Sequence, residues 1–499
     1  MKGTVFTFTL ISIIAKIVAF GRELLLSSYY GTSEISDVYL LSMTLPVTIF
    51  GFVSTGIISG YIPIYVDIER EKGKEGAVSF TNQVLNTLII LCIIIIVFYW
   101  PFSRQLIRIL ASGFSEHSVD LAVRFTNISI WAIIFTCITT VYTGFLQINN
   151  RLQITATISI PLNTIIIISI ILAKSTNQII ILPIGYTTAV VFQTMYVLCF
   201  VKKTCYHYRI TLGSHSRYLR RFYQTIGMLA MGSSITQINL LIDRTLATRV
   251  TVGGLSVFEY GSRINDLIIS LSITPICTAI FPQMVKVADN INLLKEEVSR
   301  SITFFFQIIA PVTVILLIFS ESIVKAVYYR GAFDEQSLLL TSQVVFYYGM
   351  GLFAFALRDL LSKAFYSISD TKTPMVNSII GVTLNIILNI VLSQIMGVGG
   401  LSLATSISAI ITVILLYVSL TKKIGKIYLG NYKREVEGII LTIVCSPALM
   451  LAYKLIKNWL DIEFISLGVS VFIYIVVYGI ALYKFNLIEY KNFLKRRAR

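Results

Sequence analysis

The sequence has few charged residues, few acids and almost no histidine. Only 13% of its 499 residues are charged, against 56% that are hydrophobic, and the mean hydropathy is +0.80. A soluble chain of this length needs far more polar surface to cover its core. The 25 acids against 41 basic residues leave a formal charge of +16, but no soluble module could carry that charge to nucleic acid. These shortages exclude a soluble protein and a nucleic-acid partner.

Several motifs are also missing. The six cysteines form no C-x-x-C pair and the three histidines lack metal-ligand spacing, so no metal centre of Cys or His is expected. No G-x-x-x-x-G-K-[ST] motif is present, which excludes direct ATP hydrolysis. No loop is large enough for the catalytic carboxylate or metal motif of a membrane glycosyltransferase, so the chain is not expected to be an enzyme and needs no cofactor. The first apolar run also lacks the small-residue cleavage site of a signal peptide.

Long apolar runs fill most of the chain. Each run has the ~20 residues that an α-helix needs to cross the hydrocarbon layer, and lipid offers the backbone no hydrogen-bond partner outside a helix. The runs predict an all-α polytopic membrane protein with about fourteen transmembrane helices. The expected spans are 4–28, 37–65, 82–103, 119–148, 152–173, 178–201, 220–249, 254–284, 301–327, 339–367, 374–396, 399–420, 436–456 and 463–484.

The loops alternate in basic charge. With these spans, 26 lysines and arginines fall in the N-terminal end, the C-terminal tail and the loops on their side, and six fall in the opposite loops. Cytoplasmic loops carry the excess of Lys and Arg. We therefore expect a multi-pass membrane protein with both termini in the cytoplasm.

A long basic loop, 202–221, separates six expected spans from the following six. This division predicts an N-terminal six-helix half (1–210), a C-terminal six-helix half (211–425), and two additional helices with a basic tail (426–499). Parallel repeats of this kind enclose a central cavity in many transporters.

Three basic residues lie deep within expected spans: Lys16, Arg22 and Arg263. A charge in the membrane normally faces a cavity or a partner. Glu259, Arg263 and Asp266 are spaced i, i+4, i+7 and so share one helical face, whereas Glu23 points about 100° away from Arg22 around the helix. Two interpretations stay open: internal charge pairing between helices, or a cationic cavity for an anionic substrate, since the arginine fork suits phosphate.

A second group of intramembrane residues is polar, with one carboxylate. Oxygen ligands of this kind suit a hard monovalent cation, so the group predicts a Na⁺ or H⁺ coupling site, with interhelical hydrogen bonding as the alternative. Its members are Thr236, Asn239, Asp243, Asn385, Asn389 and Thr405. Arg358, Asp359 and Lys363 lie towards the expected cytoplasmic end of another span; we expect Asp359 and Lys363, at i, i+4, to pair and support a gate.

Several stretches, in order, resemble the MurJ/MviN lipid II flippase family within the multidrug/oligosaccharidyl-lipid/polysaccharide exporter superfamily. They are "AKIVAFGRELLLSSYYGTSEISDVYLLSMTLP", "ILASGF", "DRTLAT", "YGSRINDLIISL", "YYRGAFDEQS" and "AFYSISDTKTPMVNSIIGVTLNIILNIVL". The resemblance implies a monomeric flippase of the bacterial cytoplasmic (inner) membrane. It would move lipid II, the undecaprenyl-diphosphate-linked peptidoglycan precursor of cell-wall biogenesis, by alternating access among membrane lipids. An ion gradient or the membrane potential is the expected driving force. Another lipid-linked oligosaccharide (a capsule, exopolysaccharide or O-antigen unit) is the alternative, and an exporter of cationic drugs fits the basic residues less well.

The resemblance also implies roles for individual residues. Arg22 and Arg263 match family arginines that hold the diphosphate, Lys16 replaces a third, and Asp37 matches an acidic residue near the outer end of the second helix. Asp243, Asn385, Asn389 and Thr405 match positions of a coupling cation, with Asn389 in place of a carboxylate. One departure concerns the stretch after "LP", where Phe50, Gly51 and Thr55 stand in place of an arginine pair and a glutamate.

Overall fold

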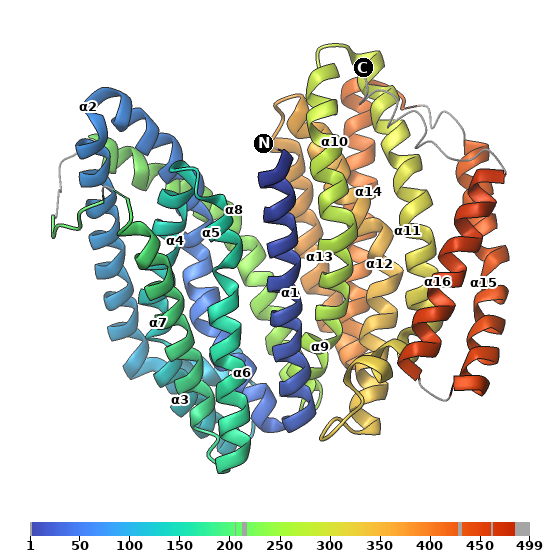
Figure 1. Ribbon diagram of the computed structural model, residues 1–499, viewed down its shortest axis with the longest axis horizontal. Helices are drawn as coiled ribbons and strands as arrows, with labels where there is room; N and C mark the ends of the chain where they lie inside the picture. The colour runs from blue at the N-terminus through green and yellow to red at the C-terminus, as the bar shows by residue number, and fades with distance from the viewer. Residues whose placement is uncertain (1, 205, 212–216, 428–431, 461–462, 485–499) are drawn as a thin grey trace. The chain divides into compact units, whose positions relative to one another are not determined.

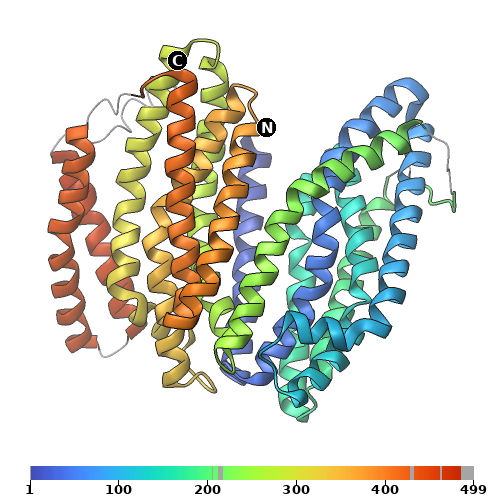
Figure 2. The ribbon, with the colours of Figure 1, turned by 180° about the vertical axis from the view of Figure 1, so that it is seen from behind.

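The computed structural model describes residues 2–204, 206–211, 217–427, 432–460 and 463–484 (Figures 1 and 2). Every regular element among these residues is a helix, and none is a strand. The all-α prediction is therefore confirmed for the described part of the chain. The chain divides into two compact units: unit 1 holds residues 1–256 and 331–333, and unit 2 holds residues 257–330 and 334–499.

Unit 1 is built from eight helices. They are α1 (Lys2–Tyr30), α2 (Glu34–Leu110), α3 (Glu116–Ser129), α4 (Ala132–Ile148), α5 (Leu152–Thr157), α6 (Ser159–Thr176), α7 (Ile181–Val201) and α8 (Arg217–Val250). Helix α8 packs along α2, α2 also packs against α3 and α4, and α1 packs against α5 and α6. The helix that opens the expected C-terminal half thus belongs to the same compact unit as the first seven. Compact units do not test sequence repeats, so the division at 210/211 stays a prediction.

The element α2 covers 77 residues and consists of two helices that meet at a kink, where the sequence predicts two spans joined by a loop. The intervening segment is rich in Glu, Lys and Arg, which are good helix formers in water, so helix continues beyond the apolar run. The single break is Gly73, with φ 72° and ψ −177°. That backbone conformation is strained for any residue with a Cβ, so the glycine is what allows the chain to turn between the two halves of α2.

Unit 2 holds most of α9 (Gly254–Ile268), whose first three residues belong to unit 1, and the helices that follow it. These are a five-residue π-helix (Ile269–Ile273), α10 (Thr274–Val287), α11 (Ile291–Tyr328), α12 (Glu335–Ser367), α13 (Lys372–Met396), α14 (Val398–Ile424), α15 (Tyr432–Leu460) and α16 (Glu463–Lys484). Helix α12 packs against α11 and α14, and α14 packs against α13.

Small residues set the closest approaches in unit 2. A Cβ added to Gly351 on α12 would overlap the Ser406 side chain on α14, and one added to Gly381 on α13 would overlap Thr412 on α14. In lipid, association of helices depends on such close packing more than on a hydrophobic driving force. Glycine at these two positions therefore holds α14 between its neighbours.

The last two helices, α15 and α16, run side by side (red in Figure 1) and pack on α11. Phe319 of α11, Leu449 of α15 and Tyr474 of α16 belong to one buried cluster. The hydroxyl of Tyr478 donates to the Gln307 carbonyl of α11 at 3.1 Å. The C-terminal pair is thus packed and hydrogen-bonded to the rest of unit 2.

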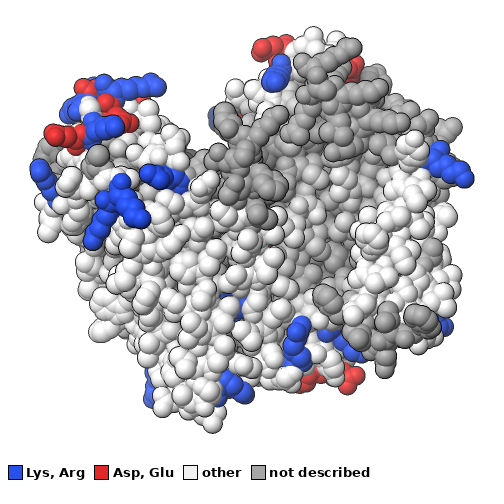
Figure 3. Space-filling view, in the orientation of Figure 1, with Lys and Arg blue, Asp and Glu red and all other residues white. Residues whose placement is uncertain are grey.

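Among the described residues, ten helical segments are long and apolar enough to cross a membrane, or eleven if α3 and α4, bent by 41°, form one span. The chain is therefore a multi-span membrane protein. The other three expected spans fall on α1, α8 and α15, which are 29, 34 and 29 residues long. Parts of these three helices lie outside the residues whose side chains the structure describes, so the number fourteen stays a prediction. Figure 3 shows one face that is largely free of charge, with Lys, Arg, Asp and Glu gathered near its edges.

Candidate functional site

Arg22 lies in the interior of unit 1 and contacts its sequence neighbour Glu23. The guanidinium donates to the Glu23 carboxylate, and the two side chains are 17% and 4% exposed. The sequence predicts that the two side chains point about 100° apart around the helix and do not meet. They form an ion pair nevertheless, because both side chains are long and flexible. Arg22 Nε is buried with no hydrogen-bond partner among the described residues. Arg22 therefore keeps one buried donor beyond its internal ion pair. Lys16, on the same helix, is partly exposed.

Two tyrosines surround Arg22 that the sequence analysis did not select. Tyr39 of α2 and Tyr186 of α7 are buried and lie close enough to interact electrostatically with the Arg22 charge. The Tyr39 hydroxyl is a second buried polar atom with no partner among the described residues. The chain has 27 tyrosines, so no sequence signal marks these two; only the packing of α1, α2 and α7 does.

Asp37 is 2% exposed and binds the beginning of α9. Its carboxylate accepts the Ser256 backbone N–H at 2.7 Å and the Ser256 hydroxyl at 2.6 Å. The first N–H groups of a helix have no partner within it, and the helix dipole favours a negative charge there. Asp37 therefore acts as a capping group from a helix 219 residues away in sequence.

On α9, Arg263 lies between two acids, as the i, i+4, i+7 spacing predicts. Its guanidinium is 3.2 Å from the Glu259 carboxylate and 3.9 Å from that of Asp266. The Arg263 side chain is 38% exposed, Glu259 is buried and Asp266 is exposed. The arginine is thus paired within its own helix and still open on one side.

The predicted coupling residues form two groups, one in each unit. On α8, the Asn239 amide donates to the Asp243 carboxylate at 3.3 Å, and the Asn239 carbonyl oxygen is buried without a partner among the described residues. Between α13 and α14, Asn389 donates to Asn385 at 3.0 Å and Asn385 donates to the Thr405 hydroxyl at 3.3 Å. The first group leaves an oxygen available, and the second links two helices. Thr236 is exposed.

The predicted gate residues of α12 do not pair as expected. Within the described part of the chain, Asp359 and Lys363 form no ion pair, and the Lys363 ammonium instead lies 5.4 Å from the centre of the Phe281 ring on α10. The Arg358 guanidinium lies 5.6 Å from the Phe355 ring centre. Cation–π contacts replace the expected ion pair because aromatic faces from the same and the neighbouring helix are within reach.

The positions of α2 at which the sequence differs from the family pattern lie against α8. Phe50 is buried, and a Cβ at Gly51 would lie 2.9 Å from the side-chain amide of Gln237. One turn away, Arg244 of α8 donates to the Thr48 hydroxyl at 3.1 Å. Positions 50 and 51 therefore pack in the interior and carry no charge, where the resemblance leads us to expect arginines. The cation nearby is Arg244 of α8. The Thr55 side chain lies outside the described residues.

Comparison with known proteins shows the family of this chain. The model of the family "Lipid II flippase MurJ" matches residues 26–470. The chain belongs to the MurJ family. It is 27% identical over 420 residues to the protein named "Probable lipid II flippase MurJ" of Buchnera aphidicola subsp. Baizongia pistaciae, covering 82% of each chain. It is 26% identical to the protein of the same name from Rickettsia prowazekii, covering 99% of each.

Solved structures show the same fold. The chain matches a lipid II flippase MurJ in an inward closed conformation with a TM-score of 0.81 and 24% identity, covering 98% of this chain and 99% of that one. It also matches an inward-facing multidrug resistance MATE family transporter of the MOP superfamily with a TM-score of 0.70 and 16% identity, covering 86% of this chain and 99% of that one. Family and fold therefore agree that this membrane protein is built as a transporter.

Proposed function

We propose that this protein flips lipid II from the inner to the outer leaflet of the bacterial cytoplasmic membrane by alternating access. The observation that carries the proposal is the family match over residues 26–470. The named relatives come from bacteria and are called lipid II flippases. On this proposal the protein works as a monomer in the lipid bilayer, with both termini in the cytoplasm, and catalyses no covalent step.

Arg22 has the chemistry that a diphosphate needs. Its ion pair with Glu23 leaves Nε as a buried donor, and a buried donor without a partner is rare in a folded protein. A phosphate oxygen would satisfy it with a charge-assisted hydrogen bond. Arg263, partly exposed between Glu259 and Asp266, offers a second guanidinium. We assign these two arginines to the diphosphate, Lys16 to a supporting charge, and Asp37 to the cap of α9.

A cation gradient is the proposed driving force. Asp243 and the partnerless Asn239 oxygen supply a carboxylate and a carbonyl oxygen in a buried place, which suits Na⁺ or a proton. Asn385, Asn389 and Thr405 supply further oxygens in unit 2. The test is the dependence of flipping on the sodium and proton gradients: if flipping by the wild type continues when both gradients are collapsed, this part of the proposal fails.

Complementation tests the main proposal. A strain whose own lipid II flippase is depleted should grow, and should expose lipid II on the outer leaflet, when it expresses this protein. Arg22→Ala should abolish rescue at normal protein level, whereas Arg217→Ala should not, because Arg217 is an arginine with an 82% exposed side chain. If the wild type is well expressed and inserted but does not rescue, lipid II is the wrong substrate.

One observation favours a second substrate. Phe50 is buried and Gly51 is packed against Gln237, so two positions where the resemblance leads us to expect arginines offer no cation. A different undecaprenyl-linked oligosaccharide would fit a site with less positive charge. Failure to rescue lipid II flipping, together with transport of a capsule or O-antigen unit in a strain lacking that flippase, would establish this alternative.

A further inference from the structure

Two asparagines of α2 hold the segment that follows α7 in unit 1. The Asn82 amide donates to the His207 carbonyl at 3.0 Å. The Asn86 amide donates to the carbonyls of Arg209 and Thr211 at 3.3 and 3.1 Å. Asn82 and Asn86 are four residues apart, so both project from one side of the helix. These hydrogen bonds hold the backbone of residues 207–211 against α2.

Two tyrosines of the same segment complete the attachment. The hydroxyl of Tyr206 donates to the Asn82 carbonyl oxygen, and that of Tyr208 donates to the Asn86 carbonyl oxygen at 2.6 Å. The Tyr206 ring also packs edge-on against Tyr142 and Phe145 of α4, at centroid distances of 5.4 and 5.2 Å. Each asparagine therefore has its amide and its carbonyl oxygen engaged. A segment held at so many points is preorganised, unlike an ordinary surface loop.

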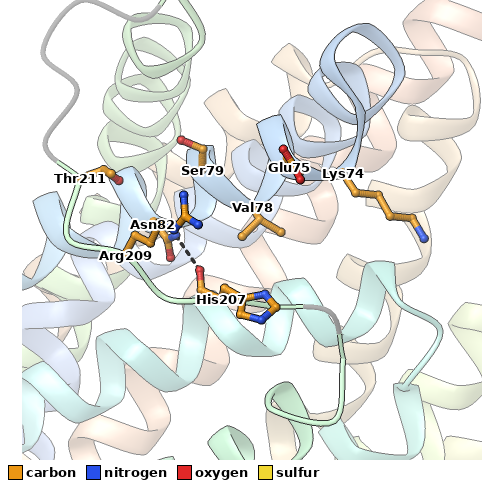
Figure 4. Close-up of a pocket in the computed structure, with 8 residues that line it drawn as sticks. All are labelled: Lys74, Glu75, Val78, Ser79, Asn82, His207, Arg209 and Thr211. Carbon is orange, nitrogen blue, oxygen red and sulfur yellow. Dashed lines mark hydrogen bonds between the residues drawn. The ribbon is translucent and has the colours of Figure 1, made fainter.

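Between this segment and α2 lies a cavity of about 400 Å³ (Figure 4). Seven of its eight lining residues have polar or charged side chains. The lining residues are Lys74, Glu75, Val78, Ser79, Asn82, His207, Arg209 and Thr211. In Figure 4, Arg209 lies beside Asn82, whereas the Lys74 side chain extends away from the other labelled side chains. The volume falls within the range of small-molecule sites.

The charges of this cavity are not neutralised by the neighbouring acids. Glu71 of α2 accepts from Tyr218 and lies 3.8 Å from Arg217, and Asp67 accepts from Arg221 at 3.0 Å. Glu71 and Asp67 are thus engaged by residues at the beginning of α8. Within the described residues, neither Lys74 nor Arg209 forms an ion pair, and Glu75 is the single acid among the lining residues.

We propose that this cavity binds a phosphate group, either that of an anionic lipid headgroup or that of a free phosphate compound. Arg209 supplies the main charge, because its guanidinium can donate two parallel hydrogen bonds, and Lys74 adds a second positive charge at the edge of the cavity. The His207 ring, the Ser79 hydroxyl and the Thr211 hydroxyl supply further donors. None of the residues assigned to lipid II or to the coupling cation belongs to the lining, so the proposal stands apart from the transport site.

Purified full-length protein tests it directly. The protein in detergent is titrated by microscale thermophoresis with a short-chain phosphatidylglycerol and, separately, with inorganic phosphate. Lys74→Gln with Arg209→Gln should weaken binding at least about tenfold, because it removes two charge-assisted contacts. The matched control is Lys202→Gln with Lys203→Gln, which removes two exposed charges from the same basic segment outside the cavity. The control should stay within about twofold of the wild type, as expected for exposed charges in salt.

Equal weakening by both double variants, or no weakening by either, would overturn the proposal, since it would indicate diffuse attraction to a basic surface. If the lining variant does not fold, Glu75→Gln decides the question. Removing the one acid of the lining should tighten binding about threefold, and unchanged or weaker affinity would overturn the proposal. Competition between phosphate and lipid indicates a site for the phosphate group itself, and binding of the lipid alone assigns it to a headgroup.

Discussion

Replacing Asp37 separates a structural role from a substrate role. Its carboxylate accepts two hydrogen bonds from Ser256, at 2.7 and 2.6 Å, in a place where it is 2% exposed. Asp37→Ala leaves the backbone N–H of Ser256 without an acceptor at the beginning of α9, while the Ser256 hydroxyl keeps the Gly253 carbonyl at 3.0 Å. A buried donor left unsatisfied costs about 1–3 kcal/mol, so losing the acceptor of this N–H should cost about 1–3 kcal/mol. Asp37→Asn keeps one acceptor oxygen and should cost about half as much.

Thermal unfolding followed by size-exclusion chromatography of the purified protein measures this difference. With about 2–4 °C of melting temperature per kcal/mol for a unit of this size, Asp37→Ala should melt roughly 2–12 °C below the wild type, with Asp37→Asn between the two. Flipping by Asp37→Asn should stay near the wild-type rate at equal protein level. The reasoning is refuted if Asp37→Ala melts like the wild type and yet does not flip, because Asp37 would then act on the substrate rather than on α9.

Three other substitutions give further tests. Gly351→Leu should separate α12 from α14, because even a Cβ at that position overlaps Ser406; we expect loss of folded protein in size-exclusion profiles, and a folded, active Gly351→Leu variant would contradict the packing. The Lys423 ammonium, 2.6 Å from Asp370, holds the pKa of that carboxyl below its ordinary value of 3.8. The stabilisation is complete above pH 3.8 and is lost as the pH falls through the lowered pKa. Lys423→Gln should therefore lower the melting temperature at pH 7 and change it little well below the lowered pKa; an equal loss at both pH values would show that the pair is not responsible. Asn239→Ala should raise the cation concentration needed for half-maximal flipping about tenfold without changing the protein level, and an unchanged cation dependence would remove Asn239 from the coupling site.

Local pattern alone determined much of this protein. Apolar runs long enough to cross a bilayer predict helices because lipid satisfies no backbone group, and most of the described residues in those runs are helical. The spacing of Glu259, Arg263 and Asp266 predicts a shared face because it depends only on the helical repeat. The order of the family-like stretches likewise predicts the family that the comparisons show.

Tertiary structure decided what depends on residues distant in sequence or on the reach of long side chains. Asp37 meets Ser256 across 219 residues, and no local pattern specifies that contact. Lys363 lies over Phe281 rather than beside Asp359, because a long flexible cation takes whichever partner the packing brings near. The segment after α7 reads as an ordinary basic loop, yet Asn82 and Asn86 fix it against α2. Helical periodicity is a property of neighbours along the chain, whereas capping, cation–π contacts and cavities arise only when helices meet.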